Sequence, residues 1–125
     1  MMDKSYALPK AERLRSLSAV RRLFNEGTSG FVYPFRYMVI TEESTLPSVE
    51  VLFSVPKRYH KRANKRNLLR RRMKEAYRLN KDIVVSAYGD SAVDLALIYS
   101  SKDLLSYKTI NNAICRILQE VAERR

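Results

Sequence analysis

The chain has 125 residues, of which 46 % are hydrophobic and 30 % are charged, a balance that indicates one folded domain over residues 1–125 rather than a disordered segment. Its 24 Lys and Arg outnumber 13 acids and give a formal net charge of +11. No apolar run approaches the roughly 20 residues of a membrane span, and the N-terminus lacks the apolar core of a signal peptide. We therefore expect a cytoplasmic protein, and the single Cys115 fits a reducing compartment.

The first half of the chain predicts one helix and two strands. Residues 1–12 are expected to be a flexible N-terminal tail, and the helical spacing of apolar residues predicts a helix over 17–26. Aromatic and β-branched residues predict a strand over 30–41. After a turn at 42–48, alternating apolar residues predict a second strand over 49–55, antiparallel to the first.

The second half predicts two more helices around a buried strand. Residues 62–80 contain no Gly or Pro and predict a long helix, whereas 82–90 is ambiguous. A continuous apolar run predicts a strand over 93–99, and Ser106 is a candidate N-cap for a helix over 106–123. The order αββαβα predicts a small α+β sandwich with helices on one main face of the sheet.

The positive charge is concentrated in one segment. Residues 57–81 hold twelve Lys and Arg but one acid, Glu75, so this segment alone carries +11 and the other hundred residues sum to zero. Pairing within the helix cannot neutralise so many bases, which indicates that an external polyanion binds them. Nucleic acid is the favoured partner over a generic anionic surface, because a membrane-lying helix needs a wider apolar face.

On a helical wheel the bases form a stripe beside the predicted core positions. Leu69, Met73, Ala76 and Tyr77 fall on one arc, which we expect to pack on the sheet. Asn67, within the stripe, is either a helix-bonded surface amide or an oriented contact to RNA or a hydrated metal ion. The expected RNA-binding residues are Lys57, Arg58, Lys61, Arg62, Lys65, Arg66, Asn67, Arg70, Arg71, Lys74 and Arg78.

Aromatic residues suggest a second surface. Phe31, Tyr33, Phe35 and Tyr37 occur at a period of two, which would place all four on one strand face. They are either core residues or part of an open groove on which bases stack, and Phe24 on the first helix has the same two interpretations.

The sequence offers no convincing catalytic constellation and no protein-bound metal site. The acids are dispersed, no Cys/His cluster has zinc spacing, and no phosphate-binding loop motif occurs. His60 is interpreted as an extra phosphate contact or a bystander within the basic segment.

The basic helix resembles the signature helix of the bacterial ribonuclease P protein subunit. That family shows an Arg-Asn-Arg box, a basic pair, a basic–acidic pair and an aromatic residue, and the strand end Ser54-Val55-Pro56-Lys57-Arg58 precedes it in a similar way. The matching residues are Arg66 and Asn67 of the box, with Leu68 in its third position, followed by Arg70, Arg71, Lys74, Glu75 and Tyr77.

The resemblance implies a fold and a function. The fold would be αβββαβα, a mixed sheet with a left-handed βαβ crossover, and the extra strand would come from a split of the 31–41 region or its neighbour. The catalyst would be an RNA subunit, with Mg²⁺ bound mainly by that RNA, and the chain itself would be non-catalytic. The protein would bind the catalytic RNA through the basic helix and help it bind Mg²⁺.

The resemblance also implies a substrate contact. The single-stranded 5′ leader of precursor tRNA would lie in a groove between the first helix and the sheet, with Phe24, Phe35 and Tyr37 as the candidate groove residues. The assembly would cleave precursor tRNA at its 5′ end. The alternatives are a stand-alone RNA nuclease and a ribosomal or architectural RNA-binding protein.

Overall fold

The computed structural model describes residues 17–43 and 47–124, so the expected tail at 1–12 lies outside the described residues. Within these ranges the chain forms an α+β domain with every predicted helix and strand. The elements are α1 (Leu17–Glu26), β1 (Thr28–Val32), β2 (Phe35–Glu43), β3 (Ser48–Ser54), α2 (Ala63–Asn80), α3 (Asp82–Ala87), β4 (Ser91–Tyr99) and α4 (Tyr107–Glu123).

Two segments resolve differently from the expectation based on residues alone. The region 30–41 is two strands, because the chain reverses at Tyr33 and Pro34, and this is the split that the family resemblance implied. The ambiguous region 82–90 contains the short helix α3. Ser106 is the N-cap of α4, as predicted, and its Oγ accepts a hydrogen bond from the backbone N–H of Thr109 at 3.3 Å.

The four strands form one mixed sheet in the order β1-β2-β4-β3. β2 is antiparallel to both β1 and β4, whereas β3 and β4 are parallel. β3 therefore runs antiparallel to β2, as predicted, but β4 lies between them. Because β3 and β4 are parallel neighbours, α2 and α3 form the crossover that joins them.

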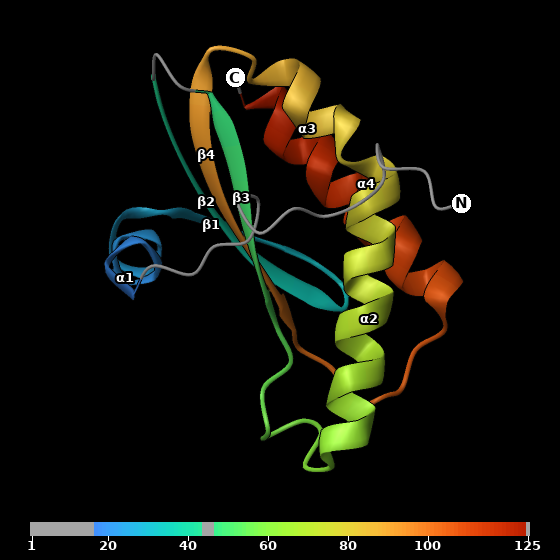
Figure 1. Cartoon of the computed structure of the whole chain (residues 1–125). Helices are drawn as coiled ribbons and strands as arrows, with labels where there is room; N and C mark the ends of the chain where they lie inside the picture. Colours follow the sequence, from blue (N-terminus) through green and yellow to red (C-terminus); the bar gives the residue numbers. More distant parts are fainter. Residues whose placement is uncertain (1–16, 44–46, 125) are drawn as a thin grey trace, which may run out of the picture.

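Helices cover the sheet unequally. α2, α3 and α4 lie on one face, and α1 lies alone on the opposite face (Figure 1). The larger core lies under the three helices, where Leu95 and Leu97 of β4 meet Ile114, Ile117 and other apolar residues of α4. α1 contributes one fully buried side chain, Leu23, to a small second core with Met38 and Ala96.

A glycine lets the β1–β2 hairpin close tightly. Gly30 lies opposite Tyr37 in the strand register, and a Cβ atom at this position would overlap the Tyr37 ring. The missing side chain therefore allows the ring to lie against β1, where its hydroxyl accepts a hydrogen bond from Arg124 at 3.2 Å.

Candidate nucleic-acid interface

The basic side chains of residues 57–74 lie mostly on the solvent-exposed side of α2 and in the loop before it. The buried residues of this helix are the four that the helical wheel predicted: Leu69, Met73, Ala76 and Tyr77. Their burial turns the adjoining stripe toward solvent, with Arg70 half-buried at its inner edge. We call this surface the cationic ridge and define it as Lys57, Arg58, Lys61, Arg62, Lys65, Arg70, Arg71 and Lys74.

Within the described residues, acidic side chains leave most of the ridge without a counter-charge. Glu75, the acid of the segment, forms an i,i+3 ion pair with Arg78, whose side chain is half-buried. No carboxylate in the described part of the chain pairs with seven ridge members, namely Lys57, Arg58, Lys61, Arg62, Lys65, Arg70 and Arg71. A dense array of cations without local counter-charges attracts a polyanion.

His60 holds the loop that precedes α2. Its side chain is only 6 % exposed, and Nε2 donates a hydrogen bond to the backbone carbonyl of Ser101 at 2.8 Å. The ring also makes an edge contact with Tyr99, with 5.6 Å between the ring centroids. The interpretations as a phosphate contact or a bystander are therefore wrong, because the imidazole is buried and joins the basic loop, residues 57–62, to the loop that follows β4.

Two guanidinium groups also stabilise these loops. Arg66 donates from Nη1 to the carbonyls of His60 at 3.1 Å and Lys61 at 2.7 Å. Arg72 donates from Nη1 to the carbonyl of Leu105 at 2.6 Å. Arg66 remains an expected RNA contact with a second, structural task. The structural role of Arg72 was not predicted from the sequence. Its position three residues after Leu69 places it beside the apolar arc, which is the signal that indicates a partly buried arginine.

Asn67 helps to orient the ridge. Its side chain is exposed, and its Oδ1 accepts a hydrogen bond from Arg70 Nη2. This contact fixes one edge of the Arg70 guanidinium, which suits a group that presents its remaining N–H donors in a defined direction.

The predicted groove residues separate into two groups. Phe35 and Tyr37 belong to the larger core and are fully buried, so the prediction that they line an open groove is wrong. Phe24 on α1 is 45 % exposed and remains a candidate. The groove assignment came from the family resemblance, whereas the two rings lie in the core that contains the α2 and α4 residues and not in the smaller core of α1.

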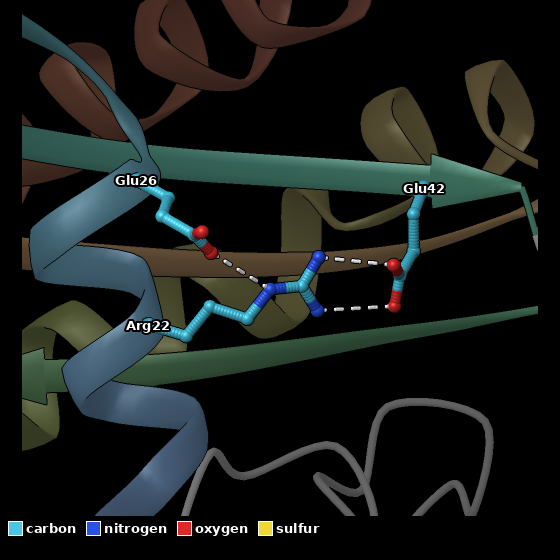
Figure 2. A network of polar contacts seen from close by, with 3 residues as sticks. All are labelled: Arg22, Glu26 and Glu42. Atoms are coloured by element: carbon cyan, nitrogen blue, oxygen red, sulfur yellow. Dashed lines mark hydrogen bonds and ion pairs between the residues drawn. The ribbon is translucent and has the colours of Figure 1, made fainter.

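α1 is attached to the sheet by a polar clamp as well as by its small core. The Arg22 guanidinium donates two hydrogen bonds to the Glu42 carboxylate of β2, at 2.9 and 3.1 Å, and one to Glu26 at 3.2 Å (Figure 2). These hydrogen bonds raise the pKa of Arg22 and lower the pKa of Glu42. The bidentate geometry fixes the direction of α1 across the sheet.

Two carboxyl groups lie side by side on the same face of the sheet as α1. Glu50 of β3 and Asp94 of β4 are partners in the parallel register. Burial raises the pKa of both groups, and the neighbouring Asp94 raises the pKa of Glu50 further. Arg22 opposes the shift at Asp94. Repulsion between the two carboxylates therefore favours retention of a proton in the pair.

The described ranges lack two other kinds of feature. Residues 17–43 and 47–124 contain no group of three or more His, Cys, Asp or Glu side chains arranged to hold a metal ion. No helix in the same ranges has the length and apolar character required to cross a bilayer.

Comparison with known proteins identifies the relatives of this chain. The family model described as Ribonuclease P matches residues 8–122. The "Ribonuclease P protein component" of Porphyromonas gingivalis is 31 % identical over 121 residues, which cover 94 % of this chain and 88 % of the relative. The protein of the same name from Chlorobaculum tepidum is 39 % identical over 111 residues, covering 79 % and 71 % of the two chains.

Solved structures share the fold. The ribonuclease P protein of Staphylococcus aureus superimposes with a TM-score of 0.70 at 19 % identity, over 89 % of this chain and 95 % of that one. The Thermotoga maritima protein gives a TM-score of 0.69 at 21 % identity, over 87 % and 96 %. At these identities the structures support the architecture, and the sequence matches support the family.

Proposed function

Since this chain belongs to the bacterial ribonuclease P protein family, and is thus a component of the ribonucleoprotein endoribonuclease that matures the 5′ ends of tRNA, we propose that its cationic ridge binds the catalytic RNA. The observation that carries this proposal is that seven ridge members, all except Lys74, are exposed or half-exposed and have no acidic partner among the residues that the structure describes. Phosphates supply the missing counter-charges, and arginine is suited to hold them through two parallel hydrogen bonds.

The 5′ leader of precursor tRNA is proposed to bind on the α1 side of the sheet. Phe24 supports this assignment, because its exposed ring can stack on an unpaired base. The Arg22–Glu42 clamp keeps α1 in place and thereby positions Phe24. Phe35 and Tyr37 take no part, since their rings are in the core.

Mg²⁺ is proposed to be bound by the RNA rather than by this chain. The described carboxylates do not fit a Mg²⁺ site: Glu50 and Asp94 have raised pKa values, and Arg22 lies close enough to Asp94 to affect its titration. When bound to the RNA, Mg²⁺ would support the cleavage chemistry. The protein residues would bind and orient the two RNA molecules, so the chain acts as one non-catalytic RNA-binding domain of the cytoplasm.

Reconstitution tests the proposal. Purified protein, the catalytic RNA and precursor tRNA are combined at limiting Mg²⁺, and release of the 5′ leader is measured. We expect cleavage to require the RNA and to be accelerated by the protein, whereas the protein alone leaves the substrate intact. Cleavage by the protein without RNA would instead indicate a stand-alone nuclease. Co-purification with ribosomal subunits but not with the catalytic RNA would indicate an architectural role.

A matched pair of variants assigns the effect to the ridge. Arg70→Ala combined with Arg71→Ala removes two charges from α2, and Lys108→Ala combined with Arg116→Ala removes two exposed charges from α4. We expect only the first double variant to reduce acceleration at limiting protein concentration. Equal losses in both variants would show that net charge, rather than the ridge, attracts the RNA.

A further inference from the structure

Tyr33 presents an aromatic ring that is fixed in position yet open to solvent. The residue lies in the β1–β2 turn and is 54 % exposed. Its hydroxyl lies 3.2 Å from Ser101 Oγ, and the backbone carbonyl of the next residue, Pro34, accepts a hydrogen bond from the N–H of Ser100 at 2.8 Å. Because the hydroxyl and the backbone next to Tyr33 are both held, little conformational entropy is lost when a ligand stacks on the ring.

Ser101 joins this ring to the basic loop. Its backbone carbonyl accepts the hydrogen bond from His60 Nε2, while its Oγ contacts Tyr33. The N–H of Asp103 also donates to Ser101 Oγ, at 3.1 Å, which fixes the serine side chain. The exposed Lys102 follows directly. One residue thus sets the position of an open aromatic ring relative to the cations of residues 57–62.

An exposed aromatic ring combined with positively charged side chains is the arrangement on which single-stranded nucleic acids bind. We propose that Tyr33 is a stacking platform for one unpaired nucleotide of RNA, with Lys102 and the basic loop contacting the phosphates on either side. The proposal rests on the RNA-binding function proposed above. The platform is distinct from the α1 face, because the contacts of Tyr33 are with the 100–106 loop.

The proposal concerns the aromatic ring of Tyr33, and two substitutions distinguish the contribution of the ring from that of the hydroxyl. Tyr33→Phe removes the contact with Ser101 but retains the ring, whereas Tyr33→Leu removes both. We expect Tyr33→Phe to bind the catalytic RNA within about twofold of the wild type and Tyr33→Leu to bind about 5- to 100-fold more weakly. Equal weakening by both variants would overturn the proposal, because it would show that the hydroxyl acts structurally.

Salt dependence gives a second readout. Tyr33→Leu removes no charge, so its affinity should fall by the same factor at every salt concentration and its salt slope should match that of the wild type. If the wild type fails to bind the catalytic RNA, the proposed function itself fails. If the wild type binds and Tyr33→Leu binds equally well, only the stacking platform is refuted.

Fluorescence reports the stacking directly, since the chain contains no Trp. Tyr33→Trp places a single indole on the platform, and Val85→Trp places one on α3, where Val85 is 40 % exposed, as a control. We expect bound RNA to quench the first indole and leave the second unchanged. Unchanged emission of the Tyr33→Trp protein at saturating RNA would overturn the proposal.

Three RNA samples identify the source of the nucleotide. The Tyr33→Trp protein is titrated with the catalytic RNA alone, with precursor tRNA alone, and with both together. Quenching by the catalytic RNA alone assigns the platform to an unpaired nucleotide of that RNA. Quenching that requires precursor tRNA, and is lost when its leader is removed, assigns the platform to the leader.

Discussion

Removal of two adjacent arginines should change how RNA binding depends on salt. Arg70 and Arg71 belong to the cationic ridge and lack a carboxylate partner in the described part of the chain. If the ridge neutralises about six phosphates, affinity should fall by about three orders of magnitude between roughly 50 and 200 mM salt. The double Ala variant should therefore bind more weakly at low salt and lose less affinity as salt rises.

The size of this change follows from counterion release. Each lost phosphate contact lowers the slope of log affinity against log salt by about 0.7 to 0.9, so two contacts lower it by about 1.4 to 1.8. Over a fourfold rise in salt, the advantage of the wild type over the variant should shrink by about 7- to 12-fold.

The assay is equilibrium binding of labelled catalytic RNA by fluorescence anisotropy at several salt concentrations. Lys108→Ala combined with Arg116→Ala is the charge-matched control and should retain the wild-type slope. The melting temperature of each variant verifies that folding is unchanged. A wild-type slope in the Arg70→Ala and Arg71→Ala protein would refute the argument, because it would show that these arginines contact no phosphate.

Two further predictions concern stability. Gly30→Ala should reduce the free energy of unfolding by about 1–3 kcal/mol, measured by urea denaturation, because the new methyl group overlaps the Tyr37 ring; an unchanged midpoint would contradict the close packing described here. Glu50→Gln should raise the melting temperature at pH 7 but not near pH 4. The pKa values of Glu50 and Asp94 are higher in the folded protein than in the unfolded chain, so the two groups destabilise the fold only as pH rises from the carboxyl pKa of the unfolded chain through the pKa of the folded protein. Glu43→Gln, at the exposed end of β2, is the control, and an equal effect in both variants would contradict the coupling of Glu50 with Asp94.

The parts of the fold that depend on local pattern were predictable from the sequence. The apolar arc of α2 and the N-cap at Ser106 follow from residues close together in the chain, and both are confirmed. The concentration of charge in residues 57–81 was likewise visible without coordinates, and the structure shows most of those side chains exposed.

The errors came from contacts between distant residues and from the choice of sheet face. Phe35 and Tyr37 were assigned to the groove through the family resemblance, but their rings join the core of the α2 and α4 residues rather than the smaller core of α1. His60 was interpreted as a phosphate contact or a bystander because its partner, Ser101, lies 41 positions away in the sequence. Charge identifies the segment that we propose to bind RNA, but it does not show which polar groups stabilise the conformation of that segment.

The parallel pairing of β3 with β4 explains why those distant residues meet. Parallel neighbours finish at the same edge of a sheet, so the loops that leave Ser54 and Tyr99 emerge next to each other. Part of the support for the basic loop therefore lies some forty residues downstream, in a stretch with little positive charge of its own. If the basic loop binds RNA as proposed, insertions or deletions within residues 100–106 should alter RNA affinity although no arginine is changed. A search for functional positions guided only by basic residues would overlook them.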